Sequence, residues 1–448
     1  MLKGTFAFFK WGFVLLIAVQ PIGLNAQQII STADFNFLKG ITQAVLDSSR
    51  IYPGQQLVAP YGANNTGGVL IRPGGRETYP SFWIRDHAMT LETGLVGQDE
   101  QKHMLMLTAA TQCDQTWITD AGSMVPFGAI ADHVRVDDLL PIYFPGTYDY
   151  VAQGGTDFGM FPPYCDQYYF IHMAHYYISD ANDVDILQEE INGTSLIDRL
   201  EIAFKVPPSR QDNHIVYTND AFRGVDFGFR DAIYITGDLS YSSILKYRAA
   251  LQLSALFEQI GNNSKAKAYR DIASKIKAAL PVAFADKNGM LKASTAIGSH
   301  PDVWATALAV YLGILDGDHA LKAARHLAKA YVAGTLAYKG NIRHIIDGEG
   351  YNGTPYWEKG IVHPNQFQNG AYWGTPTGWV AYTIAQVDNK LAAQLVKEYI
   401  SELRESDFRQ GSEFDGPYEC FYPPNYTRGP VYLTTVSAPF IVLKSMLQ

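Results

Sequence analysis

Two acidic residues stand among aromatic residues in the stretch FRGVDFGFRD, residues 222–231. Asp226 and Asp231 are five positions apart, and Arg230 lies between them in the sequence. Like charges beside apolar bulk raise the pKa of at least one carboxyl when they are buried, which keeps an acid protonated near neutral pH. The stretch is therefore a candidate for general acid chemistry. A purely structural ion pair between Asp226 and Arg230 is the alternative.

A second acidic stretch, SEFDGPYECFYPPNYTRGP, lies near the C-terminus. Glu419 is flanked there by Tyr418 and Phe421, and the two prolines that follow stiffen the segment, as a catalytic base requires. Glu413 and Asp415 stand in a more polar context, and we expect them to face water. Glu419 is therefore the candidate base.

Two helix starts also carry polar side chains that suit a ligand. Trp83, Arg85 and Asp86 open a helical pattern in YPSFWIRDHAMTLETG, and Tyr164 and Asp166 open another in PPYCDQYYF. We expect these five residues to bind substrate. An Asp in a first helical turn is also an ordinary helix-starting residue, so a structural role stays open for both acids.

The stretch YWEKGIVHPNQFQNGAYWGTPTGW, residues 356–379, combines flat aromatic rings with amide groups. Aromatic rings pack against the C–H faces of sugars and amides bond to hydroxyls, so this composition indicates a neutral, hydroxyl-rich ligand. Glu358 is a reserve for either catalytic role. The candidate binding residues are Arg230 from the first stretch and Trp357, His363, Gln368, Asn369, Tyr372 and Trp373 from this one.

Composition limits the possible partners. Of the 448 residues, 47% are hydrophobic and 18% are charged, so the chain can bury a large core. The net charge is -9 and the sequence has no run of Lys and Arg, which argues against a nucleic-acid partner. No linker or low-complexity tract divides the chain, and we expect one domain over residues 27–448.

The N-terminus has the layout of a secretory signal peptide. Lys3 and Lys10 precede the apolar run WGFVLLIAV, and Ala26 offers a cleavage point. We therefore expect residues 1–26 to be removed and the protein to be secreted or periplasmic. A membrane anchor needs roughly 20 unbroken apolar residues, and Gln20 interrupts this run. No later segment is apolar enough to span a bilayer.

Metals and cofactors are not expected. Cys113, Cys165 and Cys420 permit one disulfide but form no zinc pattern. The sequence also has no calcium-binding loop, Gly-rich phosphate loop or His-x-x-x-His pair.

The helical periodicity of the sequence indicates the elements that position these residues. Apolar residues recur at helical spacing on both sides of short polar turns, which predicts five helical hairpins. The turns lie at 97–100, 179–183, 261–265, 315–319 and 387–390. Helices at 33–49 and 431–447 pair as a sixth hairpin, which predicts an all-α fold, an (α/α)6 toroid of six helical hairpins.

Long connections rich in Gly, Pro and aromatic residues join the hairpins. Connections of this length in a compact domain are usually functional, so we expect the site on the face where they gather. They cover approximately residues 50–85, 114–165, 207–239, 283–301, 335–367 and 406–429.

Four of the quoted stretches resemble the (α/α)6-barrel glycosidases, the group of trehalases, glucoamylases and processing α-glucosidases. FWIRDHAMTL is similar to the stretch that lines the terminal-sugar subsite of trehalase-like members. RGVDFGF resembles the segment that bears their general acid, with Val225 in place of Trp. YECFYPP is similar to the segment that bears the general base of processing α-glucosidases, with Cys420 and Tyr422 in place of two Asn. QNGAYWGTPTGW resembles the group's sugar-binding segments.

The resemblance implies an exo-acting, inverting hydrolase acting on an oligosaccharide. Asp226 would protonate the leaving oxygen and Glu419 would activate water, with Asp231 in reserve as the acid. Two other classes stay open. A polysaccharide lyase would use His363, Tyr356 and Arg343 on a uronate, and a non-catalytic glycan-binding protein would leave the carboxylates idle.

Overall fold

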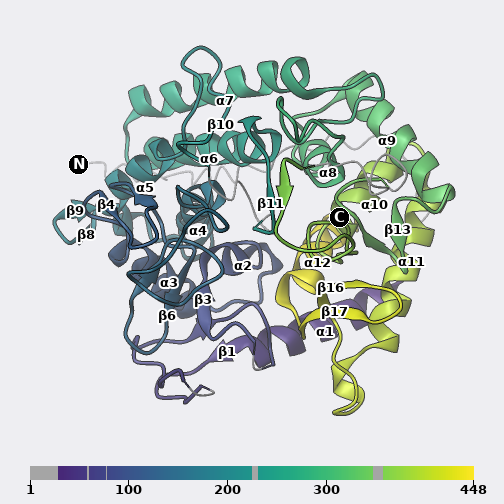
Figure 1. Ribbon diagram of the computed structural model, residues 1–448, viewed down its shortest axis with the longest axis horizontal. Coiled ribbons are helices and arrows are strands. Elements are labelled where there is room, and N and C mark those ends of the chain that lie inside the picture. The colour runs from purple at the N-terminus through teal and green to yellow at the C-terminus, as the bar shows by residue number, and fades with distance from the viewer. Residues whose placement is uncertain (1–28, 58–59, 77, 224–230, 347–356, 448) are drawn as a thin grey trace, which may run out of the picture.

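The computed structural model describes residues 29–57, 60–76, 78–223, 231–346 and 357–447 (Figure 1). Twelve α-helices and three short 3-10 helices form in these residues. The α-helices are α1 (Thr32–Ser49), α2 (Ile84–Ala88), α3 (Gln98–Ala110), α4 (Tyr164–Ala181), α5 (Leu196–Lys205), α6 (Ser240–Gln259), α7 (Asn263–Phe284), α8 (Val303–Tyr311), α9 (Gly317–Val332), α10 (Thr377–Ala385), α11 (Asn389–Glu405) and α12 (Leu433–Ser445). The 3-10 helices are η1 (Leu91–Thr93), η2 (Val184–Gln188) and η3 (Phe408–Gln410).

The helices are of two kinds. In α8 and α10 nearly every residue is buried, whereas α9 and α11 bury one face and expose the other. An amphipathic helix covers a core and a helix that is apolar all round lies inside it. The inner helices are neighbours in chain order, because α4 packs against α2 and α6, and α10 packs against α8 and α12.

Short polar turns join several of the helices where the sequence predicted them. The turns expected at 261–265, 315–319 and 387–390 lie at the α6–α7, α8–α9 and α10–α11 junctions. The first and last helices of the described chain, α1 and α12, pack together, and the rings of Phe35 and Phe440 stack with centroids 5.3 Å apart. Helical periodicity therefore located these helices correctly, whereas the turns expected at 97–100 and 179–183 overlap the start of α3 and the end of α4.

The prediction of an all-α (α/α)6 toroid is wrong. The described residues contain seventeen short strands in eight small sheets, so the fold is mixed α/β. The long connections satisfy their backbone groups by pairing in short antiparallel ladders rather than remaining irregular. The strands are β1 (Arg50–Ile51), β2 (Leu70–Ile71), β3 (Ser81–Trp83), β4 (Trp117–Ile118), β5 (Met124–Val125), β6 (His133–Arg135), β7 (Pro141–Ile142), β8 (Glu190–Ile191), β9 (Thr194–Ser195), β10 (Tyr217–Thr218), β11 (Ile233–Tyr234), β12 (Gly237–Asp238), β13 (Ala337–Tyr338), β14 (Asn341–Ile342), β15 (Lys359–Gly360), β16 (Tyr418–Tyr422) and β17 (Tyr426–Pro430).

The sheets are local except where they tie distant segments together. Seven have two strands each, and the eighth has the order β3-β6-β7. β11 pairs with β15 across more than one hundred residues, and β16 and β17 form a hairpin. In Figure 1, β11 and β16 lie toward the middle of the view, with helices around them.

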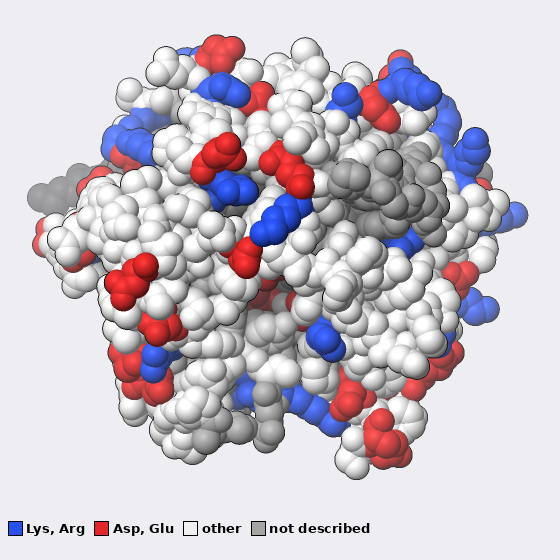
Figure 2. Space-filling model, in the orientation of Figure 1, with Lys and Arg blue, Asp and Glu red and all other residues white. Residues whose placement is uncertain are grey.

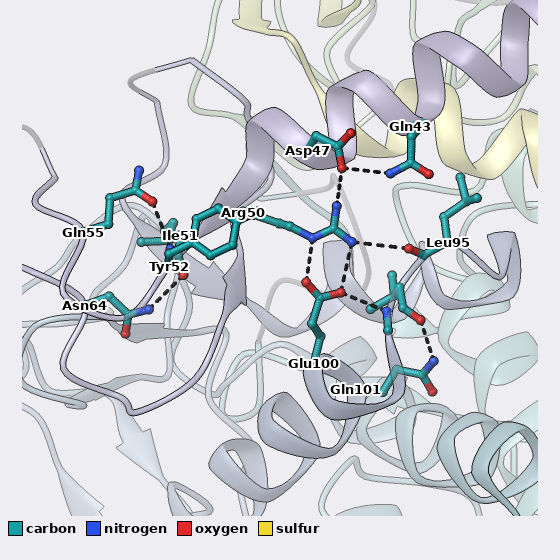
Figure 3. A network of polar contacts seen from close by, with 12 residues as sticks. Gln43, Asp47, Arg50, Ile51, Tyr52, Gln55, Asn64, Leu95, Glu100 and Gln101 are labelled. Atoms are coloured by element: carbon teal, nitrogen blue, oxygen red, sulfur yellow. Dashed lines mark hydrogen bonds and ion pairs between the residues drawn. The ribbon is translucent and has the colours of Figure 1, made fainter.

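A polar network fixes α1 against α3 (Figure 3). The Arg50 guanidinium, at the end of α1, donates to both carboxylate oxygens of Glu100, at 2.6 and 3.0 Å. It also donates to Asp47 within α1 and to the carbonyl of Leu95. Glu100 in turn accepts from the backbone N–H of Gly97 and so caps the start of α3. One bidentate contact therefore joins two helices and satisfies a helix terminus.

The structure bears differently on the predicted signal peptide, on membrane-spanning helices and on the disulfide. Residues 1–26, the predicted signal peptide, lie outside the described residues. Across the described ranges, no helix combines the length and the apolarity that crossing a membrane would require. Cys113, Cys165 and Cys420 are all buried free thiols, so the disulfide that the sequence permitted does not form.

Candidate active site

The site is built at the point where strand β3 turns directly into helix α2. Trp83 ends β3 and pairs with His133 on β6. Arg85 and Asp86 follow at once in the first turn of α2. The pairing therefore brings Asp132, which precedes β6, next to Arg85, although some fifty residues separate them in the sequence.

Arg85 lies among the acidic residues. Its side chain is 7% exposed, its Nη1 lies 3.7 Å from Asp132 Oδ1, and its Nε lies 3.9 Å from Asp86 Oδ2. Burial works to lower the pKa of Arg85, but electrostatic interactions with the Cys165 thiol and with the carboxyl groups of Asp132 and Asp86 outweigh it and hold the pKa well above its usual value. The guanidinium is therefore a fixed positive charge within the acidic group.

The acids in the first turns of α2 and α4 are both buried. Burial raises the pKa of Asp86 to about 6, against the opposing charge of Arg85. Burial and the charge of Asp132 raise the pKa of Asp166 well above its usual value. Neither carboxyl oxygen of Asp166 has a hydrogen-bond partner among the residues that the structure describes. Asp166 therefore has hydrogen-bonding capacity for a ligand.

Aromatic rings and a histidine form one wall of the site. The Trp83 ring stacks on the His133 ring with centroids 4.3 Å apart, and Tyr148 meets both rings edge-on. His133 Nδ1 lies 2.8 Å from Asp132 Oδ2, which fixes the orientation of the imidazole. The wall offers a flat apolar surface beside the carboxyl groups.

Glu419 enters the site from strand β16. It is 5% exposed, and its Oε2 accepts a hydrogen bond from the Tyr79 hydroxyl. Burial raises the pKa of Glu419 to about 8, and the charges of Asp231 and Asp86 act in the same direction. Glu419 therefore holds a proton near neutral pH.

The backbone around Glu419 has unusual conformations. Gly429 on β17 has φ +54°, and a Cβ there would lie 2.5 Å from Glu419 Cβ and 2.7 Å from its Oε2. Val431 and Tyr79 also have positive φ, 56° in both cases, which costs about 1–3 kcal/mol for residues other than glycine. Val431 precedes Tyr432, whose hydroxyl donates to Asp86 Oδ1 at 2.9 Å. Strain of this kind is commonly found where side chains must be aimed precisely at a ligand.

Asp231 is the acid of the first stretch that the structure places in the site. Its Oδ1 accepts from Gln368 Nε2 at 2.8 Å. Burial raises the pKa of Asp231, Arg85 opposes this, and Asp132 adds to it. Asp231 and Glu419 affect each other electrostatically, so the reserve acid and the predicted base share one site. Asp226 and Arg230 lie outside the described residues.

The space-filling view shows the shape and the charges of one face of the molecule. Figure 2 has a hollow near the middle of the visible face, and acidic side chains appear at its bottom. Basic and acidic side chains mark its upper edge. An ion pair between Lys359 of β15 and Asp157, 2.9 Å apart, ties together two of the long connections.

Three predicted binding residues make hydrogen bonds within the fold. Tyr164 is fully buried and its hydroxyl donates to the carbonyl of Phe222 at 2.6 Å. Trp373 is also fully buried, and its indole N–H donates to the carbonyl of Phe367. Asn369 closes its own loop by donating to the carbonyl of Val362 at 3.0 Å. These contacts satisfy buried polar groups and anchor connections.

The other predicted residues lie in surrounding segments. Trp357 is buried, and Glu358, which follows it, accepts a hydrogen bond from Thr236 near the β11–β15 pair. The Tyr372 ring stacks on Tyr422 with centroids 5.8 Å apart. Nothing in these contacts joins the reserve acid Glu358 to Glu419.

Two of the three residues considered for a lyase lie within the described ranges. Arg343 is buried and donates to the carbonyl of Gly370 and to Asn365, at 2.8 Å each. His363 is exposed on its loop. Tyr356 lies outside the described residues.

Sequence reasoning missed several residues that the site contains. They are Tyr79, Asp132, His133, Gly429 and Tyr432. A signal existed for two of them, because Asp132 and His133 form a polar pair inside the apolar run AIADHVRV. Tyr79 and Tyr432 carry no comparable signal, since both stand in stretches already rich in aromatic residues.

Comparisons with known proteins add no family. No protein-family model matches the chain, and no curated protein is a significant match to it. In the described ranges no group of three or more His, Cys, Asp or Glu side chains is arranged to hold a metal ion. The chemistry that the site offers is proton transfer between carboxyl groups beside a fixed cation and an aromatic wall.

Proposed function

We propose that the chain is an exo-acting glycoside hydrolase that inverts the anomeric centre of an oligosaccharide. The observation that carries the proposal is that Glu419 and Asp231 are both buried and lie near enough for Asp231 to raise the pKa of Glu419, with burial raising both pKa values. A protonated and an ionised carboxyl facing one sugar are the machinery of glycoside hydrolysis. The motif resemblance to trehalases and processing α-glucosidases points to the same chemistry.

The surroundings suit a sugar. Trp83 and Tyr148 supply apolar ring surface for the C–H face, and Asp166 supplies a carboxyl for hydroxyl groups. Arg85 balances part of the negative charge, so the site tolerates several acids close together. A terminal sugar seated in a hollow of this kind is consistent with exo action.

The pKa values favour a reversal of the roles expected from the sequence. Glu419, with its pKa raised to about 8, is the protonated group and donates to the glycosidic oxygen. Asp231, oriented by the Gln368 amide, is the ionised group and activates the water. Inversion requires the two carboxyls to stand roughly 6.5–9.5 Å apart with water between them.

Leaving-group dependence tests this assignment. Glu419→Gln should lower kcat/KM for unactivated glycosides by about 10²–10⁴-fold and largely spare glycosides whose leaving group needs no proton, such as dinitrophenyl glycosides. Asp231→Asn should impair both substrate types. The product anomer, read by NMR, should be inverted. Equal losses for both variants on every substrate contradict the roles, and an unsaturated sugar product contradicts hydrolysis altogether.

We also propose that residues 1–26 direct secretion and are then removed. Lys3 and Lys10 ahead of an apolar run support this. Mass spectrometry of the protein expressed with its native N-terminus should give a mature chain that begins after Ala26. An intact N-terminus in the cell interior would rule the proposal out.

A further inference from the structure

An open groove lies beside the acid site and takes no part in the chemistry proposed above. Its volume is about 530 Å³, within the usual range for ligand sites. One wall is the loop 364–366 and the other is the turn end of the β16–β17 hairpin, residues 422–428. The lining side chains include Asn365, Gln366, Tyr422, Tyr426 and Arg428.

The loop wall is held in a fixed shape. Asn365 and Phe367 both have positive φ, 66° and 40°. Arg343 holds the loop by donating to Asn365 Oδ1, and Tyr426 accepts from the N–H of Phe367 at 3.2 Å. Strained backbone that is restrained on both sides is typical of a segment that contacts a ligand.

Both walls lead directly to the acid site. Gln368, which donates to Asp231, follows Gln366 by two residues. Tyr422 follows Glu419 by three residues along one strand, a distance of about 10 Å at the usual rise per residue. Measured along the strand, the hairpin wall of the groove therefore begins about one or two sugar rings from Glu419.

The groove differs from the acid site in chemistry. No carboxylate side chain lines it, and Arg428 is its charged residue. The Arg428 guanidinium lies 4.8 Å from the centre of the Tyr426 ring, which adds a flat cationic surface to the aromatic ones. Aromatic rings, amides and one guanidinium bind sugar rings without performing acid or base catalysis.

We infer that this groove binds the sugar residues on the leaving-group side of the cleaved bond. The inference rests on the proposed function, because an exo-acting hydrolase places only the terminal sugar in its hollow and every further residue beyond the cleaved bond. The groove makes the preferred substrate an oligosaccharide of three or more sugars rather than a disaccharide.

Chain-length kinetics test the groove. Tyr422→Ala should lower kcat/KM for oligosaccharides by about tenfold or more, the equivalent of one lost sugar contact, and leave an aryl monoglycoside within about twofold. Tyr422→Phe should retain the preference for long chains. Tyr52→Ala, which removes an exposed tyrosine on a different connection, is the matched control and should change neither substrate. Equal losses on short and long substrates overturn the inference.

Binding separates this inference from the proposed function. If the parent protein hydrolyses no glycoside, the proposed hydrolase activity fails, but the groove can still be tested in the Glu419→Gln variant. Calorimetry with malto-, cello- and xylo-oligosaccharides should then show binding that strengthens with chain length and weakens with Tyr422→Ala. The inference is overturned if none of these sugars binds at millimolar concentration. It is also overturned if Tyr422→Ala leaves their binding unchanged.

Discussion

Five carboxyl groups in the site interact with one guanidinium, that of Arg85, and this ratio limits how many of them can be ionised together. They belong to Asp86, Asp132, Asp166, Asp231 and Glu419. Arg85 offsets one negative charge, so ionising every acid together would leave several uncompensated charges in a buried space. Burial raises the pKa of Asp86 to about 6 and of Glu419 to about 8. At neutral pH Glu419 therefore retains its proton, and burial favours the protonated form of Asp166 as well.

Gly429 is expected to set the position of Glu419. In Gly429→Ala the new Cβ meets the Glu419 side chain at less than 3 Å, so the carboxyl must move. A displacement of about 1 Å at a catalytic group costs around 10²-fold in rate, and overpacking costs about 1–3 kcal/mol of stability. Steady-state kinetics and urea unfolding measure the two effects.

The control for this variant is Gly317→Ala. Gly317 has φ +51°, close to that of Gly429, but a Cβ there has no atom within 4 Å. It should therefore carry the same backbone strain without touching the site, and kcat/KM should stay at the parent value. If Gly429→Ala also keeps full activity, Glu419 either moves freely or takes no part in the reaction.

At the scale of elements, the helices and the strands differ in how far the sequence predicts them. Helices such as α6 and α7 repeat their apolar pattern over several turns, so periodicity locates them. Strands of two residues are too short to show alternation. The pairing of β3 with β6 depends on tertiary contacts across some fifty residues, which no local pattern encodes.

The same distinction explains which site residues were predicted. Arg85, Asp86 and Asp166 stand at helix starts, where charged residues beside aromatic ones are conspicuous in the sequence. Asp132 reaches the site only through strand pairing and was missed. Trp373 was predicted to bind sugar because composition does not distinguish a ring in the core from a ring facing a ligand.

The polar turns at the far ends of the helices should affect stability alone. Asp388 caps α11 by accepting from the N–H groups of Lys390 and Leu391. This turn follows the end of α10, and the nine residues of α10 span about 13 Å at 1.5 Å per residue. Asp388→Ala should cost about 1 kcal/mol in urea unfolding and leave kcat/KM unchanged. Asp388→Asn should restore most of the stability, and a loss of activity without a loss of stability would contradict this division.

For the whole molecule, buried acids and buried histidines act on stability in opposite directions. Burial raises the pKa of Glu419 to about 8 and of Glu402 to about 7, above the ordinary value of 4.5, so the folded protein binds these protons more tightly than the unfolded chain. Their stabilising contribution is present in full below pH 4.5 and is lost as pH rises through 7 to 8.

Buried histidines limit the stability that the buried acids provide at acidic pH. Burial lowers the pKa of His87 to about 3 and of His175 to about 4, below the ordinary value of 6.5. The unfolded chain therefore binds these protons first, and the folded state loses stability as pH falls below 6.5. The two groups together place the maximum of stability between about pH 4.5 and 6.5, where their opposing slopes cancel.

The free energy of unfolding, measured against pH, should show this maximum. Variants of the buried acids should then identify which residues cause the loss of stability at higher pH. Between pH 6.5 and 8 the parent protein should lose about 2 kcal/mol through Glu419 alone, at about 1.4 kcal/mol per pH unit for one proton. Glu419→Gln cannot ionise, so it should unfold at higher urea than the parent at pH 8 and at nearly the same urea at about pH 4.5 and below. Glu402→Gln, a buried acid of α11, should flatten the curve near pH 7 without abolishing glycoside hydrolysis. If Glu419→Gln follows the parent curve at every pH, Glu419 is ionised in the folded protein, and its role as the proton donor is excluded.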